Sequence, residues 1–92
     1  MDNKQKDILI QNMVDNLPTL RKRLDMSQAD LATKIGVGRS SLSSIENKKR
    51  SMTWNTFLSL ILIFTKNKET DKLLNAMGIY TDELNDFIKN TI

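Results

Sequence analysis

Residues 27–50 read SQADLATKIGVGRSSLSSIENKKR and decide the fold. Ser27 and Asp30 have the spacing of a capping box, in which each side chain accepts a hydrogen bond from the other residue's backbone. Apolar residues then recur at helical spacing as far as Ile35. Gly36-Val37-Gly38 follows, and a glycine at this point can take the left-handed conformation that ends a helix. The stretch therefore predicts a short capped helix that ends in a tight turn.

A second helix is predicted from Arg39, with an apolar inner side and a polar outer side. Leu42 and Ile45 point inward, and Glu46 lies on the same side. The outer side consists of one arginine and small polar residues: Arg39, Ser40, Ser43, Ser44 and Asn47. Such a surface suits the major groove of DNA. An ordinary helical hairpin with a polar solvent-exposed face is the alternative that the local pattern leaves open.

The positive charge of the chain is concentrated on this stretch and its flanks. The whole chain has a net charge of +3, whereas residues 20–50 alone hold eight Lys and Arg against three Asp and Glu. The rest of the chain is therefore net negative. Contacts with DNA phosphates require this distribution, although a solvated basic face would produce it too.

The composition excludes several classes of protein. With 92 residues, 39% hydrophobic and 27% charged, the chain is typical of a single soluble globular domain, and 3 Gly and 1 Pro favour helices throughout. It has no Cys and no His, so we expect no disulfide, no metal site, no cofactor and no catalytic site. The carboxylates of Asp82, Glu83 and Asp86 are interpreted as a solvated helix face. The sequence therefore predicts no enzyme.

No targeting or membrane signal is predicted. Asp2 and Asp7 interrupt the N-terminal apolar residues, which excludes the apolar region of a signal peptide. The most apolar run, residues 57–64, contains Ser59 and is too short to cross a bilayer. We therefore expect a cytoplasmic protein that does not bind membranes.

The helices before the motif allow two interpretations. Residues 4–15 predict a first helix or helical arm. Asn16 is a good N-cap and Pro18 is tolerated in a first turn, so the preferred interpretation is a new helix from here to about Leu24. A continuous helix kinked at Pro18 is the alternative.

After the motif, Thr53 caps a long helix that begins at Trp54 and is apolar over much of its circumference. Such a helix is buried on two sides, by the motif helices on one and by C-terminal helices or a partner subunit on the other. Thr70 is predicted to cap a short helix that ends at Gly78, and Thr81 a last one. The possible dimer surface is Trp54, Leu60, Ile63, Phe64 and Phe87.

The segment LRKRLDMSQADLATKIGVGRSSLSSIENKKR, residues 20–50, resembles the phage-repressor and Cro-like, or XRE-type, helix-turn-helix regulators. It has their LR, then SQ-x-x-LA, a glycine turn, a polar helix and E-N-x-K-R. The resemblance implies an all-α, lambda-repressor-like fold with about five core helices plus an additional terminal helix. We expect one domain over 1–92, with a core at 16–66, an arm at 1–15 and possibly dimerising helices at 67–92.

The resemblance also implies roles for individual residues. Gln28 would anchor a phosphate at a helix N-terminus, with Ser27 beside it. Arg39 would read guanine through both its O6 and N7 atoms. Ser40, Ser43 and Ser44 would read bases, or would only allow close approach. A structural ion pair is implied between Arg21 and Glu46. The backbone beyond the reading helix would be held by Lys48, Lys49 and Arg50, which could also be plain surface charges.

Two positions differ from the family pattern. Lys48 stands where the family usually has Gly after E-N, which predicts that Asn47 ends the helix in the left-handed conformation. Gly38 stands where Ser or Thr often caps the reading helix. Neither difference changes the expected fold.

The function implied is that of a sequence-specific transcriptional regulator, a repressor by expectation, which binds double-stranded DNA as a homodimer on an inverted repeat. The alternative is a protein-interaction module, such as an antitoxin or adaptor on the same scaffold, with a protein partner. The apolar surplus of the helix from Trp54 motivates this alternative.

Overall fold

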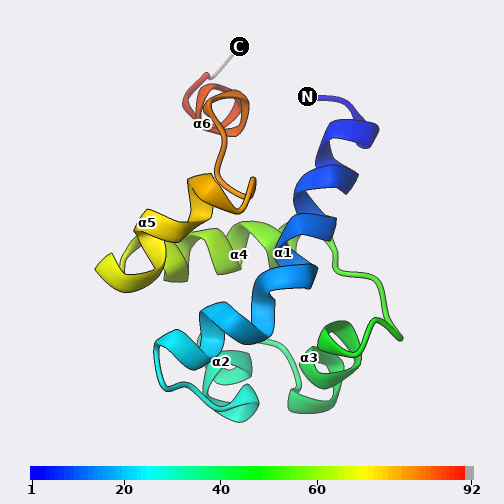
Figure 1. Cartoon of the computed structure of the whole chain (residues 1–92). Helices are drawn as coiled ribbons and strands as arrows, with labels where there is room; N and C mark the ends of the chain where they lie inside the picture. Colours follow the sequence, from blue (N-terminus) through cyan, green and yellow to red (C-terminus); the bar gives the residue numbers. More distant parts are fainter. Residues whose placement is uncertain (91–92) are drawn as a thin grey trace.

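The computed structural model describes residues 1–90 and folds this part into helices alone, joined by short turns (Figure 1). The predicted all-α class is confirmed. No helix in these residues combines the length and the apolar character needed to span a bilayer. The elements are α1 (Asn3–Arg23), α2 (Gln28–Ile35), α3 (Arg39–Glu46), α4 (Trp54–Thr65), α5 (Lys68–Ala76) and α6 (Asp82–Lys89).

Helix α1 runs without interruption through Pro18. The predicted new helix at Asn16 is therefore wrong, and the continuous alternative is correct. A proline inside a helix removes one backbone hydrogen bond and costs about 3 kcal/mol. Met13, Leu17 and Leu20 lie on both sides of the proline and are fully buried. Burial of each such side chain contributes about 2 kcal/mol, which outweighs the local cost of the proline.

Helices α2 and α3 form as predicted. Ser27 accepts from the Asp30 backbone and Asp30 accepts from the Ser27 backbone, so the capping box is complete. Gly36 ends α2 in the left-handed conformation, with φ of 76°. Leu42 and Ile45 are the buried residues of α3. The two helices contact each other, and α1 packs against α3.

Helix α4 begins after the predicted cap Thr53 and packs against α1, α2 and α5, so it is buried on two sides as expected. On the C-terminal side, α5 packs against α4 and buries its second side. Leu60 and Phe64 have no exposed surface in the monomer. Their assignment to a possible dimer surface is therefore wrong, because both side chains belong to the hydrophobic core of the protomer.

Helix α5 begins earlier than predicted, with Asn67 at its N-cap position. Thr70 is not a cap but a buried side chain inside the helix. Its hydroxyl donates to the backbone carbonyl of Phe64 at 2.7 Å and so ties α5 to the end of α4. Gly78, with φ of 69°, follows the helix and confirms the predicted end.

Helix α6 is capped by Thr81, as predicted, and lies beside the N-terminal part of α1 at one end of the molecule (Figure 1). Trp54 stacks on Phe57 and meets Phe87 edge to face, with ring centroids 6.4 Å apart in the second pair. The ammonium of Lys6 lies 5.1 Å from the Trp54 ring. Helices α2 and α3 occupy the opposite end of the molecule.

Candidate nucleic-acid interface

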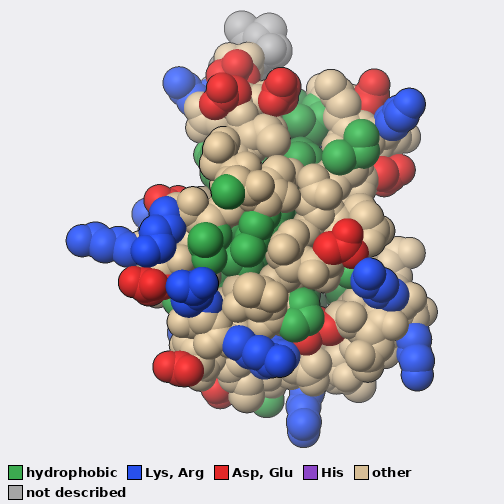
Figure 2. Space-filling model, in the orientation of Figure 1, with side chains coloured by type: hydrophobic (Ala, Val, Ile, Leu, Met, Phe, Trp, Pro, Cys, Tyr) green, Lys and Arg blue, Asp and Glu red, His purple; other side chains and the backbone are tan. Residues whose placement is uncertain are grey.

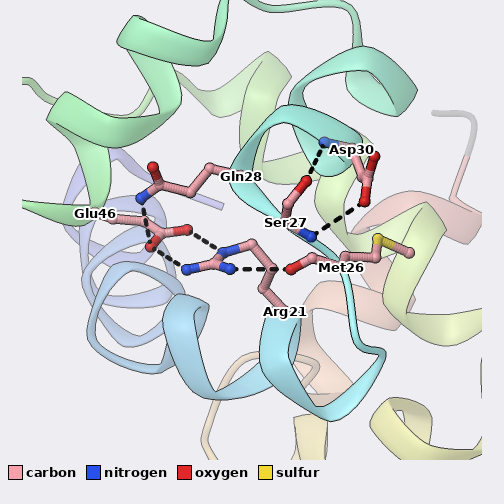
Figure 3. A network of polar contacts seen from close by, with 6 residues as sticks. All are labelled: Arg21, Met26, Ser27, Gln28, Asp30 and Glu46. Atoms are coloured by element: carbon pink, nitrogen blue, oxygen red, sulfur yellow. Dashed lines mark hydrogen bonds and ion pairs between the residues drawn. The ribbon is translucent and has the colours of Figure 1, made fainter.

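A buried ion pair fixes α3 to α1 (Figure 3). Arg21 Nε donates to Glu46 Oε2 at 2.9 Å, and Nη2 donates to Oε1 at 3.1 Å. A third bond runs from Nη1 to the backbone carbonyl of Met26 at 2.9 Å. The side chains of Arg21 and Glu46 are 12% and 4% exposed. One guanidinium therefore joins α1, the loop before α2 and the last residue of α3.

The pair satisfies the condition under which a buried charge is tolerated. Two parallel N–H···O bonds give Arg–carboxylate pairs both strength and a fixed geometry. Hydrogen bonding to Glu46 raises the pKa of Arg21, while burial opposes the rise and the charge of Glu46 adds to it. The guanidinium therefore stays charged. The pair bridges α1 and α3, and this contact supports a structural role.

Gln28, the predicted phosphate anchor, is held by the same carboxylate. Its Nε2 donates to Glu46 Oε1 at 3.1 Å, which links the first residue of α2 to the last residue of α3. A primary amide carries two N–H donors, so one remains for another acceptor. Neighbouring Ser27 uses its hydroxyl oxygen to accept from the backbone of Asp30. Ser27 is the N-cap of α2 and Gln28 is its first residue. Backbone N–H groups at a helix N-terminus lack partners within the helix and favour anions.

The outer side of α3 carries the predicted base readers. Arg39 and Ser40 are exposed, and Ser43 and Ser44 are half-buried. All four belong to the helix whose inner side is fixed by Leu42 and its neighbours. The exposed guanidinium at the helix start is free to meet a base edge. The serine side chains are short, so the backbone of α3 could come close to the edges of the bases in a DNA groove.

The end of α3 differs from the prediction. Asn47 has φ of −84°, and Lys48 takes the left-handed conformation with φ of 62°. The Lys48 N–H donates to the Ile45 carbonyl at 3.0 Å, and the Lys49 N–H donates to the Ser44 carbonyl at 2.9 Å. This pair of bonds defines a Schellman motif, in which the residue after the C-cap must be left-handed. The turn therefore keeps its geometry although the position holds lysine.

The three basic residues after α3 have different surroundings. Lys48 Nζ lies 2.9 Å from Asp15 Oδ1 on α1. Arg50 Nη1 donates to Ser41 Oγ at 2.9 Å. Lys49 is exposed. Sequence reasoning missed Asp15, because it lies far from the motif in sequence and only the fold brings it beside the end of α3.

Basic and acidic side chains are unevenly distributed over the face of the molecule that Figure 2 shows. On the face shown in Figure 2, most Lys and Arg lie in the half that holds α2 and α3, with Asp and Glu among them, and a group of Asp and Glu lies at the end that holds α6 beside a Lys or Arg side chain. This matches the sequence, since residues 20–50 hold eight of the fourteen Lys and Arg. Among residues 1–90, no group of three or more His, Cys, Asp or Glu could hold a metal ion.

Comparison with known proteins agrees with this geometry. Residues 19–53 match a protein-family model described as "Helix-turn-helix". The match spans the end of α1, both short helices and the loop as far as the cap of α4. No curated protein and no solved structure matches the chain.

Proposed function

We propose that this protein, whose residues 19–53 match a helix-turn-helix family model, is a sequence-specific DNA-binding repressor of the phage-repressor and Cro-like, or XRE, type. Helix α3 reads the major groove, and two copies bind an inverted repeat. The observation that carries the proposal is the fixed orientation of α3. Its polar side faces outward because Arg21 and Gln28 both hold Glu46 on the inner side.

Base reading is assigned to the outer side of α3. Arg39 is the principal reader, since a guanidinium can donate to O6 and N7 of one guanine and discriminate by about 1–3 kcal/mol. Ser40 is exposed and contacts a base edge, while Ser43 and Ser44 are half-buried and allow the helix to approach the groove.

Phosphate binding is assigned to both ends of the helix pair. Gln28 uses its remaining amide N–H, and Ser27 marks the N-terminus of α2 where backbone donors face outward. Beyond α3, Lys49 and Arg50 contact the backbone through exposed side chains. Lys48 contacts a phosphate only after it leaves Asp15.

The size of the protein fits the proposed dimer on one side of DNA. The longest dimension of the protomer is 36 Å. Successive major grooves on one side of DNA are about 34 Å apart, so two protomers side by side can each place one α3 in a groove. Such a dimer covers both half-sites and excludes other proteins, which is the basis for repression. Of the predicted dimer surface, Trp54 and Ile63 are half-buried and Phe87 is 40% exposed, so these three are accessible to a second copy.

Selection of bound sequences from a random DNA pool tests the proposal. An inverted repeat with half-sites one helical turn apart is the expected result, and a sequence without symmetry would contradict the dimer. On the selected operator, Arg39→Ala should lose roughly tenfold or more in affinity, while binding to random DNA should change much less. Lys34→Ala, which removes a positive charge from α2, is the matched control and should weaken both complexes similarly. Equal losses for Arg39→Ala on both DNAs would overturn its role as a reader.

A second function, that of an antitoxin-like or adaptor module with a protein partner, is favoured by one observation. Ile8, Phe87 and Ile88 are 54%, 40% and 48% exposed, and they lie on the helices that meet at the end away from α2 and α3. A partner bound there would leave the DNA-reading side free. Sedimentation of the purified protein separates the two uses of this surface. A stable homodimer that Ile88→Ser dissociates favours self-association, whereas a monomer favours a partner.

A further inference from the structure

We propose that Asp15 is a built-in competitor of DNA phosphate for Lys48, and that it limits the affinity of the protein for DNA of any sequence. The inference rests on the proposed function, because it assumes that α3 lies in a groove. It concerns a residue on α1, outside the matched segment and outside the predicted interface.

The contact is built from three side chains. Lys48 Nζ lies 2.9 Å from Asp15 Oδ1. Gln11 Nε2 donates to the same carboxylate oxygen at 2.8 Å from one helical turn earlier on α1. These two partners lower the pKa of Asp15, the hydrogen bond to Lys48 most. The carboxylate is therefore oriented and fully charged at neutral pH, as a phosphate would be.

The Lys48–Asp15 pair is formed in the structure, but Lys48 can exchange the carboxylate for another anion. The side chains of Lys48 and Asp15 are 62% and 45% exposed, so water and ions reach both. Exposed ion pairs are weak and are screened by salt. A DNA strand offers a continuous row of phosphates, and it can therefore displace one carboxylate from the ammonium. This differs from the Arg21–Glu46 pair, which is buried, so that its exchange would leave a charge without its partner.

The backbone limits what Lys48 can reach. Its left-handed conformation is fixed by the Schellman bonds at the end of α3, so the side chain begins from a set direction near α1. The same side chain lines a surface pocket of about 340 Å³ between α1 and the loop after α3, together with Lys49 and Arg50. Only Lys48 of these three is paired with a carboxylate in the part of the chain that the structure describes.

The competition has a measurable consequence. In the wild type, Asp15 and the DNA phosphates share Lys48, so on average Lys48 neutralises less than one phosphate and releases fewer of the cations condensed on the DNA. Without the carboxylate, Lys48 is free to neutralise a phosphate and to release the ion that the phosphate held. Each such neutralised phosphate steepens the dependence of log K on log salt by about 0.9.

The test compares Asp15→Asn with Asp7→Asn. Both remove one negative charge from α1 and keep the shape of the side chain, and Asp7 is an exposed residue about two turns earlier that lines the same pocket. Binding to a random-sequence duplex and to the selected operator is measured by fluorescence anisotropy over a series of salt concentrations. Asp15→Asn should bind both DNAs severalfold more tightly at low salt, with a slope steeper by about 0.9. Asp7→Asn should leave the slope unchanged.

A second variant ties the effect to Lys48. Lys48→Gln in the Asp15→Asn background should abolish the gain in affinity and in slope, whereas Lys48→Gln in the wild type should change either quantity little. Thermal unfolding of each variant checks that the fold is kept. Equal slopes for Asp15→Asn and Asp7→Asn would overturn the inference, since Lys48 would then be only a clamp between α1 and α3. Absence of any DNA binding by the wild type would instead overturn the proposed function on which the inference rests.

Discussion

Helices α3 and α6 are both eight residues long, yet the protein holds them in opposite ways. Helix α3 is mostly polar, buries Leu42 and Ile45, and ends in the ion pair of Glu46. Helix α6 contains Phe87 and Ile88, which are 40% and 48% exposed, and buries only Leu84.

The difference shows that a short helix can be attached through one buried carboxylate as well as through apolar side chains. The polar helix is joined to two other elements by one carboxylate, so its outer side chains are held in a fixed direction. That is the condition for reading base edges. The more apolar helix has spare surface and few attachments, which suits an interface that forms with another molecule.

The largest expected effect comes from breaking the attachment of α3. Glu46→Ala leaves the guanidinium of Arg21 in a site where only 12% of its side chain reaches solvent. Removal of one partner of a buried pair costs about 3 kcal/mol in the free energy of unfolding. Urea denaturation measures this cost, and Asp86→Ala on the exposed side of α6 is the control, with an expected change below about 0.5 kcal/mol. Similar losses for the two variants would show that the pair does not hold α3.

A smaller loss is expected where α6 is attached. Leu84→Ala removes the one fully buried side chain of α6 and should cost about 2 kcal/mol, at the low end for a buried leucine, because a peripheral helix can shift to fill the space. Hydrogen exchange should show faster exchange in α6 and unchanged protection in α2 and α3. Ile88→Ala, half-exposed on the same helix, should change neither quantity. Equally faster hydrogen exchange in α3 would mean that the two ends of the molecule unfold as one unit.

The smallest effect is expected at the left-handed turn after α3. Lys48→Gly relieves a conformation that costs a residue with a side chain about 1 kcal/mol, and it also removes the contact with Asp15. The net result should be a modest gain in thermal stability. The Asp15→Asn variant measures separately how much stability is lost with the Lys48–Asp15 contact. Gly36→Ala, with φ of 76° at the end of α2, should lower stability by about 1 kcal/mol. A destabilised Lys48→Gly would show that the ion pair outweighs the strain.

The parts of the fold that depend on neighbouring residues could be predicted from the sequence. The capping box of Ser27, the turn at Gly36 and the buried positions Leu42 and Ile45 all follow from spacing within a few residues. The all-α architecture followed from the resemblance, and residues 19–53 match a helix-turn-helix family model.

The errors occur where packing overrides a local signal. Pro18 is a strong signal for a helix boundary, yet buried side chains on both sides keep α1 continuous. Asn47 tolerates the left-handed conformation better than lysine does, but the hydrogen bonds of the Schellman motif fix which position must adopt it. The apolar surplus of α4 left a C-terminal helix or a partner subunit open as its second cover, and Leu60 and Phe64 are buried within the protomer.

The contacts of the candidate site also fall into those that the sequence could predict and those that it could not. Arg21 with Glu46 was available from the resemblance, because the family pattern carries both positions. The contact of Gln28 with Glu46 and that of Asp15 with Lys48 have no such signal. Each joins polar residues that lie on different elements far apart in the sequence, and surface polar residues show no periodicity that would reveal their partner.

Helix α1 has a consequence for how the protein can be divided. Its 21 residues span about 30 Å, so one helix reaches from the ion pair beneath α3 to the aromatic cluster beside α6. Leu31 and Leu42 share their core with Met13, Phe57 and other side chains outside residues 19–53. A peptide limited to the family segment would therefore expose most of its apolar contacts and should not fold alone. The segment that matches the family is therefore shorter than the smallest unit that is stable.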